Sequence, residues 1–405
     1  MNRNKVGMTV LLGVLLGLGF IVAPAEATSL ADVDVHGFVS QGFLYSDEYN
    51  YLAHNSIDGT FEFNEVGINF SKKQSDRLRV GIQLFSRDLG DISNNKVTMD
   101  WAYGDYRWRD WLGIRAGKIK LPTGLYGEIQ DMDMLYTQII MPQGIYKSLL
   151  RETFNAVSGG GLYGVIPLGV IGDLNYQFVG GAVSADSESG EAKYTNNLMS
   201  GLATQSGEND YDTTYGGAIR WDTPLEGLLL NYSISSGSVR STLLIDQSYP
   251  TIGGTAVVAD ADFFGQIFSL EFTWNGLVIS GEYHWIDNDI ESTLLNSDTT
   301  QVCYYLAASY KFTDLFTLGA YYAELYPDKD DKNGDKLVAR GKADHGAWQK
   351  DLAMTLRFDL NDYWVFKLEG HMVDGTASVI ALDNPDSDWS EDKWYYGATK
   401  ITFSF

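Results

Sequence analysis

The chain has 405 residues, with 29 Lys and Arg against 53 Asp and Glu (a net charge of −24), 13% aromatic residues and one cysteine. So many aromatic residues exclude a disordered acidic chain, and one cysteine excludes a disulfide framework or a multi-cysteine metal site. The acidity argues against nucleic acid as a partner, because phosphate binding needs a basic face. The mean hydropathy of −0.15 argues against a helical membrane bundle but allows a membrane β-barrel, in which only every second residue faces lipid.

Residues 1–27 have the pattern of a secretory signal peptide. Arg3 and Lys5 precede a short apolar run, and Ala25-Glu26-Ala27 supplies the small residues that a signal peptidase reads, so we expect cleavage after Ala27. The alternative, an N-terminal anchor helix, is disfavoured because the run is too short for a comfortable membrane span. No later segment contains 18 consecutive apolar residues. We therefore expect residues 28–405 to be exported as one domain, either soluble or a barrel.

Apolar and polar residues alternate through almost the whole of residues 28–405, which is the period of a β-strand with one apolar face. In residues 362–371, Trp364, Phe366 and Leu368 alternate with a face that carries Lys367, Glu369 and His371. Seven short turns alternate with eight long polar connections, which implies 16 strands. Short turns at one end and long loops at the other are typical of an outer-membrane β-barrel, and 16 strands leave room for an aqueous channel.

The expected strands are residues 33–46, 58–72, 77–88, 97–108, 111–120, 152–166, 168–183, 211–222, 226–238, 260–274, 277–288, 299–312, 315–326, 347–360, 363–374 and 390–405. In the last of them, Phe405, Phe403 and Ile401 share one face. A terminal Phe that closes such a strand resembles the signal read by the barrel assembly machinery of bacterial outer membranes. The alternative is a soluble β-protein that ends in Phe by chance.

The third long connection, residues 121–150, is the most informative segment. It is far more apolar than the other long connections, and its Leu135, Ile139, Ile140 and Met141 suit a solvated external loop poorly. A long apolar loop must bury itself, and the space available is the barrel lumen. We therefore expect an inward-folded loop that narrows the pore.

Residues Gly117–Tyr126, with Pro142 and Arg151 further along, resemble the bacterial general and substrate-specific porins, in particular the phosphate-selective porin O/P-like group. The third loop of such porins folds inward as a constriction. The resemblance implies a homotrimeric channel in the outer membrane of a Gram-negative cell, embedded among lipid and lipopolysaccharide. It also implies passive diffusion of small hydrophilic solutes or ions.

Charged side chains near the constriction would set the selectivity of such a channel. The candidate acids on the loop are Glu128, Asp131 and Asp133. The candidate bases are Arg77, Arg79, Arg87 and Arg115 on early strands, and Lys147 and Arg151 where the loop rejoins the wall. The alternative is that these charges are solvated wall or pair with one another. Strict alternation would aim Lys118 and Lys120 at lipid, so we expect them beyond the membrane edge or after a bulge.

The sequence offers no persuasive catalytic constellation, and its five histidines show no metal-binding spacing, so we expect neither an enzyme nor a bound cofactor. Acidic external loops such as residues 327–346 and 375–389 can bind calcium adventitiously. A different function stays open. The barrel could be the sheath of an outer-membrane electron-transfer complex with a cytochrome as its partner.

Overall fold

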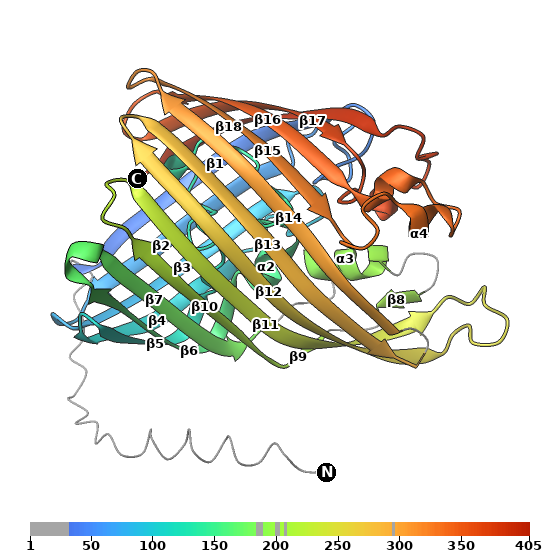
Figure 1. Ribbon diagram of the computed structural model, residues 1–405, viewed down its shortest axis with the longest axis horizontal. Helices are drawn as coiled ribbons and strands as arrows, with labels where there is room; N and C mark the ends of the chain where they lie inside the picture. Colours follow the sequence, from blue (N-terminus) through green and yellow to red (C-terminus); the bar gives the residue numbers. More distant parts are fainter. Residues whose placement is uncertain (1–31, 184–188, 199–202, 206–208, 294–295) are drawn as a thin grey trace, which may run out of the picture. The chain divides into compact units, whose positions relative to one another are not determined.

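The computed structural model describes residues 32–183, 189–198, 203–205, 209–293 and 296–405, and the expected signal peptide lies outside these ranges. Residues Asp34–Phe405 form one compact unit, a single antiparallel sheet wound into a barrel (Figure 1). Among the described residues, no helix is long and apolar enough to cross a membrane.

The barrel wall consists of β1 (Asp34–Ser46), β2 (Phe63–Lys73), β3 (Leu78–Leu89), β4 (Thr98–Arg109), β5 (Leu112–Lys120), β6 (Ala156–Pro167), β7 (Asp173–Ala182), β10 (Thr213–Asp222), β11 (Leu228–Ile245), β12 (Ala256–Trp274), β13 (Leu277–Ser292), β14 (Asn296–Lys311), β15 (Phe316–Tyr326), β16 (Gln349–Asp359), β17 (Trp364–Asp374) and β18 (Lys393–Ser404). The other elements are β8 (Ala203–Gln205), β9 (Asp210–Tyr211), α2 (Arg151–Phe154), α3 (Gly190–Leu198), α4 (Asp335–Val338), η2 (Asp133–Leu135), η3 (Ser148–Leu150), η4 (Gly169–Ile171), η5 (Asp344–Ala347) and η6 (Ala381–Asp383).

Sixteen strands close the wall, which confirms the fold expected from the sequence. Strand β1 pairs with both β18 and β2, and β7 pairs with β6 and β10, so every wall strand has two neighbours. Closure matters because a barrel satisfies all its strand hydrogen bonds internally and leaves no edge. At the seam, the backbone N–H and C=O of Phe405 exchange hydrogen bonds with Gly37, each 3.0 Å long.

The wall differs from the sequence prediction chiefly at one place. Residues 239–259, expected as a loop, mostly continue β11 and β12 as a long hairpin. Four side chains of this extension form a small apolar cluster with Ala203 of β8: Leu243, Ile245, Val257 and Ala259. The burial of these side chains explains why the two strands continue beyond their predicted ends. The sixth strand also begins later than expected, because α2 occupies residues 151–154.

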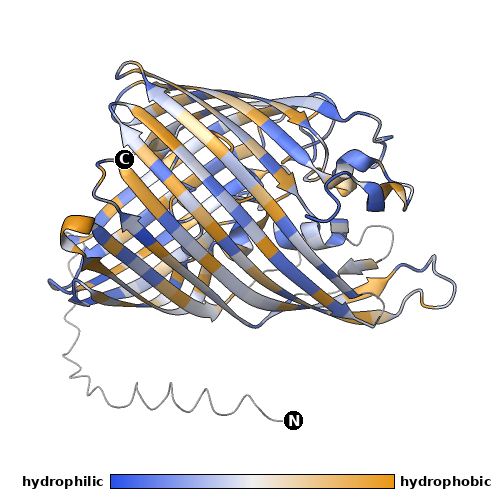
Figure 2. Cartoon of the chain, viewed as in Figure 1, coloured by the Kyte–Doolittle hydropathy of each residue, from blue (hydrophilic) through white to orange (hydrophobic). Residues whose placement is uncertain are grey.

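The two faces of the wall differ in polarity, as Figure 2 shows by the alternation along the strands. Outward-facing Leu306 and Met354 are 64% and 59% exposed. Inward-facing Lys367 and Glu369 are 1% and 3% exposed, so the lumen at their level is filled rather than open. An apolar outer surface around a polar interior is the arrangement of a membrane barrel.

Replacing an outward-facing residue in mid-strand by a charge tests which face meets lipid. For Leu306→Arg we expect the free energy of unfolding in phospholipid vesicles to fall by about 2–4 kcal/mol, the cost of placing Arg near the bilayer midplane. Guanidinium titration measures it. The matched controls are Leu306→Ala and Val170→Arg, the latter in the η4 turn, where we expect a loss of about 0–1 kcal/mol. Equal losses for both arginine variants would contradict the assignment.

Candidate functional site

The connection between β5 and β6, residues 121–155, crosses the lumen as the sequence predicts. Its backbone bonds to strands on the far side of the barrel: the N–H of Gly124 donates to Ser233 Oγ of β11 (3.0 Å), and the N–H of Leu125 donates to Glu282 Oε1 of β13 (2.8 Å). We call this segment the lumen loop. Its apolar residues explain its course, because they pack against lumen-facing side chains rather than solvent.

The apolar packing of the lumen loop involves two clusters. Ile139 and Ile140 are 6% and 4% exposed and join a cluster around Trp394 of β18. Met141 and Ile145 pack in a second cluster with Tyr321 and neighbouring residues of β14 to β16. Ile139, Ile140 and Met141 are thus buried as the sequence predicts, whereas Leu135, expected to avoid solvent with them, is 59% exposed.

One end of the loop is fixed by a cluster of four buried charges, which we call the Asp131 cluster. Lys120 Nζ lies 2.7 Å from Asp131 Oδ1 and 3.4 Å from Asp100 Oδ2. Arg151 Nη2 lies 3.1 Å from Asp100 Oδ1 and 3.9 Å from Asp131 Oδ2. Two acids and two bases therefore balance one another out of contact with solvent.

Asp100 reaches this cluster through a β-bulge. The pairing of β4 with β3 shifts between Gln83 and Leu84, so Asp100 has no strand partner and its side chain turns inward. Its carboxylate also accepts hydrogen bonds from Gln83 (3.1 Å) and Asn155 (2.9 Å).

The middle of the loop is fixed by a second buried group, the Asp133 cluster. Asp133 Oδ2 lies 2.8 Å from Lys400 Nζ and accepts a 2.8 Å hydrogen bond from Thr402. Its other carboxylate oxygen lies 3.8 Å from Lys367 Nζ. Lys400 also pairs with Glu65 of β2 at 2.5 Å, so the cluster joins the loop to β2, β17 and β18.

The electrostatics of the two loop carboxylates follow from these partners. Burial alone would raise the pKa of Asp131, but the positive charges of Lys120 and Arg151 hold that pKa below its ordinary value of 3.8. The pKa of Asp133 is likewise lowered by its two lysines against the effect of burial. Both groups are therefore ionised at neutral pH, and their attraction for the bases is lost only when the pH falls through the native pKa, below 3.8.

Carboxylates of the wall accept hydrogen bonds from the loop backbone. The two oxygens of Glu369 accept the N–H groups of Ile139 (2.8 Å) and Ile140 (2.7 Å). His371 lies 3.0 Å from the same carboxylate through Nε2 and 3.0 Å from Asp351 through Nδ1, which fixes the ring between two acids. A buried N–H without a partner would cost about 1–3 kcal/mol, so these bonds stabilise the inward course of the loop.

Cations of the wall donate to the loop carbonyls in the same way. Lys367 donates to the C=O groups of Tyr136 (2.9 Å) and Gln138 (2.8 Å). Arg357 donates to the C=O groups of Tyr136 (2.7 Å) and Met134 (2.9 Å). The wall thus presents acids to loop amides and bases to loop carbonyls.

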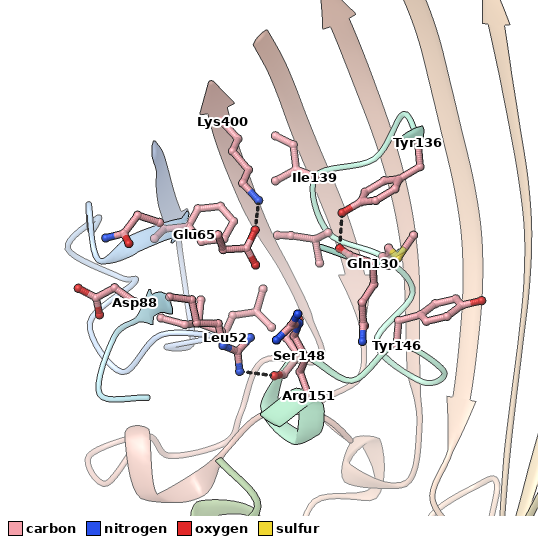
Figure 3. Close-up of a pocket in the computed structure, with 16 residues that line it drawn as sticks. Leu52, Glu65, Asp88, Gln130, Tyr136, Ile139, Tyr146, Ser148, Arg151 and Lys400 are labelled. Carbon is pink, nitrogen blue, oxygen red and sulfur yellow. Dashed lines mark hydrogen bonds and ion pairs between the residues drawn. The ribbon is translucent and has the colours of Figure 1, made fainter. Parts of the chain in front are cut away.

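Figure 3 shows how closely the loop approaches the wall. A cavity of only about 60 Å³ separates Tyr136, Ile139 and Tyr146 of the loop from Glu65 and Lys400 of the wall. The loop therefore packs closely against this part of the wall.

On the other side a line of hydrogen-bonded polar side chains faces the lumen, and we call it the polar row. Arg115 Nε lies 3.3 Å from Asp105, and Arg115 Nη1 lies 3.4 Å from Gln177 Oε1. Gln177 Nε2 in turn donates to Glu128 Oε1 at 3.2 Å. Glu128 is exposed and Arg115 is partly exposed, so neither charge is enclosed by the protein.

Of the other predicted charges, two contact residues outside the polar row and two are exposed near a short turn. Arg87 is buried and pairs with Glu152, and Lys147 lies over the ring of Tyr194 at 4.4 Å. Arg77 and Arg79 are exposed near the short turn between β2 and β3, and Arg79 lies opposite Asp105 of the polar row in the pairing of β3 with β4. Of the nine predicted charges, the structure therefore buries Arg87, Asp131, Asp133 and Arg151 and leaves Glu128 and Arg115 accessible in the lumen.

Several residues of the site were not among the predicted ones. Lys120 was expected outside the membrane or after a bulge, yet it is buried at the end of β5 beside Asp131. Asp100, Glu369, Lys367 and Lys400 were also missed. The signal for Glu369 and Lys367 was present as charges on the polar face of residues 362–371, whereas the bulge that orients Asp100 leaves no recognisable pattern in the sequence.

Within the described ranges, no group of three or more His, Cys, Asp or Glu side chains is arranged to hold a metal ion. Asp383, one of the acids expected in the external loops, instead pairs with Lys193 at 2.8 Å. Calcium binding by these loops stays a prediction.

Comparison with known proteins places this geometry in a class of fold. No family model matches the chain, and no curated protein matches it. Among solved structures, the chain is similar to the outer-membrane channel DcaP of Acinetobacter baumannii (13% identity, TM-score 0.59, covering 94% of this chain and 100% of that one). It is also similar to OmpT of Vibrio cholerae (11%, 0.57, 94% and 100%) and to the anion-selective porin of Comamonas acidovorans (12%, 0.52, 92% and 99%). The fold is that of an outer-membrane β-barrel.

Removing one charge of the Asp131 cluster should release the loop. In Asp131→Asn, Lys120 and Arg151 lose a buried partner, at a cost of about 3 kcal/mol, so we expect larger and noisier single-channel currents from a barrel that still folds. Wild-type currents should change in the same direction as the pH falls below 3.8, where the carboxylate becomes protonated. Bilayer recordings and circular dichroism measure the two properties.

The matched control for that prediction is Glu128→Gln, because Glu128 carries the same kind of charge but lies outside both clusters. We expect this variant to keep quiet currents. If Asp131→Asn and Glu128→Gln gave the same current noise, the Asp131 cluster would not hold the loop.

Proposed function

We propose that the chain forms a water-filled channel in the outer membrane of a Gram-negative cell, through which small hydrophilic solutes or ions diffuse passively. The observation that carries this proposal is the lumen loop, which crosses a polar interior and leaves the polar row accessible at its edge. A lumen lined by charges at its narrowest point is how channels of this fold select solutes. The similar structures titled as a channel and as a porin support the same function.

The channel explains the structure better than the sheath of an electron-transfer complex does. A sheath must enclose a carrier protein, whereas here the lumen loop occupies the interior and bonds to β11, β13 and β17. We also propose a channel rather than an enzyme, since the buried charges are engaged with one another and with the loop backbone. The resemblance of Gly117–Tyr126 to phosphate-selective porins supports the channel and leaves its solute open.

A homotrimer is part of the proposal. A trimer form of Vibrio cholerae OmpT is among the similar structures (11% identity, TM-score 0.52, covering 92% of this chain and 99% of that one). We further propose lipid and lipopolysaccharide as the surroundings of the outer face, and recognition of Phe405 by the barrel assembly machinery. Cross-linking of the folded protein in outer-membrane vesicles tests the oligomer.

Planar bilayers test the channel directly. Folded protein should produce discrete conductance steps, and deletion of residues 128–141 should enlarge them, because the deletion removes the part of the loop that fills the lumen. Circular dichroism establishes that the shortened chain still folds. Folded wild-type protein without discrete steps would contradict the proposal.

Reversal potentials in asymmetric salt test the polar row. Glu128→Gln should shift ion preference toward anions, and Arg115→Gln should shift it toward cations, because each removes one accessible charge from the lumen. Arg340→Gln is the control, since Arg340 is exposed in the external connection between β15 and β16, outside the polar row, and we expect a smaller shift. Shifts of the same sign in the first two variants would show that the row does not determine selectivity.

A further inference from the structure

A second cavity, separate from the polar row, lies among the external connections. Its volume is about 870 Å³, and it opens between the ends of β4 and β5, residues 89–97, α2, α3 and η6. A volume of this size is typical of pockets for small ligands. The charged residues that line it are four acids and four bases: Asp91, Asp100, Glu152, Asp383, Lys96, Lys118, Arg151 and Lys193.

The part of the cavity nearest the barrel presents buried donors without hydrogen-bond partners. Arg151 is 6% exposed and Thr153 is 2% exposed. Within the described part of the chain, Nε of Arg151 and Oγ1 of Thr153 make no hydrogen bond, and Nη2 of Arg151 meets Asp100 as an ion pair without hydrogen-bond geometry. Buried polar atoms in native proteins are nearly always satisfied, so unsatisfied donors beside a cavity indicate an acceptor that enters from it.

Lys118 adds a cation to the same part. Its Nζ donates to the C=O of Met99 at 2.6 Å, which leaves two of the three ammonium hydrogens for another acceptor. The other charges here are balanced, since Arg151 pairs with Asp100 and Glu152 pairs with Arg87. Lys118 therefore adds a positive charge beyond these two pairs, which suits a carboxylate.

The end formed by the external connections has the opposite sign. Lys193 Nζ lies 2.7 Å from Asp91 Oδ1 and 2.8 Å from Asp383 Oδ2, so one base lies between two acids. The charges of these three side chains sum to −1, and Lys96, in the connection that carries Asp91, is the remaining base of the cavity. This end is suited to an ammonium group.

From this charge separation we propose that the cavity binds a zwitterionic solute of the size of a short peptide before it enters the channel. Its carboxylate lies against Lys118, Arg151 and Thr153, and its ammonium group lies against Asp91 and Asp383. A simple anion or cation gains at one end and loses at the other, whereas a zwitterion gains at both. The inference deepens the proposed function by naming a solute class, and it rests on that function only for the passage of the bound solute into the channel.

Calorimetric titration of the folded chain in detergent tests the site with three probes: trialanine, N-acetyl-trialanine and trialanine amide. The first carries both charges, the second lacks the ammonium group and the third lacks the carboxylate. We expect trialanine to bind about tenfold more tightly than either capped form, because each cap removes one charge-assisted interaction. Equal affinity for the three probes, or binding of none of them, would overturn the proposal.

Two variants assign the ends of the ligand. In Asp383→Asn the preference for trialanine over the acetylated probe should shrink while its preference over the amide stays. In Lys118→Gln the preference for trialanine over the amide should shrink while its preference over the acetylated probe stays. A purely structural effect would weaken all three probes alike and would also overturn the proposal. The control is Asp330→Asn, in an external connection that does not line the cavity, which should leave all affinities unchanged.

Recordings from the same preparation separate this inference from the proposed function. Conductance steps without trialanine binding would overturn the peptide site and leave the channel intact. Trialanine binding with the expected preferences but without conductance steps would support the site and overturn the channel.

Discussion

A loop that crosses the inside of a barrel brings its backbone N–H and C=O groups out of water, and each of them needs a partner. Charged side chains of the wall are those partners: carboxylates accept from the loop N–H groups, and cations donate to the loop C=O groups. Glu369 and Glu282 accept from loop amides, and Lys367 and Arg357 donate to loop carbonyls. The position of the loop, and with it the remaining width of the lumen, depends on this matching.

Charged side chains inside this barrel have two different roles. The Asp131 and Asp133 clusters are neutral or nearly so, buried and fixed, and they determine where the loop lies. The polar row is accessible and, in the proposed channel, is the charge that a solute meets. Charge type alone does not separate these uses, because Asp131 and Glu128 are three residues apart on the same loop and have opposite exposure.

The sequence allowed the wall to be predicted almost completely, because alternation of period two and the sorting of short and long connections are local properties. The inward course of residues 121–155 was also predictable, since Ile139, Ile140 and Met141 have no place in solvent. The partners within the site were not, because a shift of one residue moves every side chain of a strand to the other face. The bulge at Asp100 is such a shift. The burial of Lys120 follows from its ion pair with Asp131, which the sequence does not reveal.

The bonds of the lumen loop join residues that are far apart along the chain. Ile139 and Glu369 are separated by 230 positions, and Asp133 and Thr402 by 269. The partners of Asp133, Ile139 and Ile140 therefore do not exist until the last strands have joined the wall, whereas Lys120 and Asp100 lie beside Asp131 on strands next to the loop. A barrel without its last strands would lack every one of these partners of the middle of the loop, so the loop reaches its final position only when β17 and β18 complete the wall.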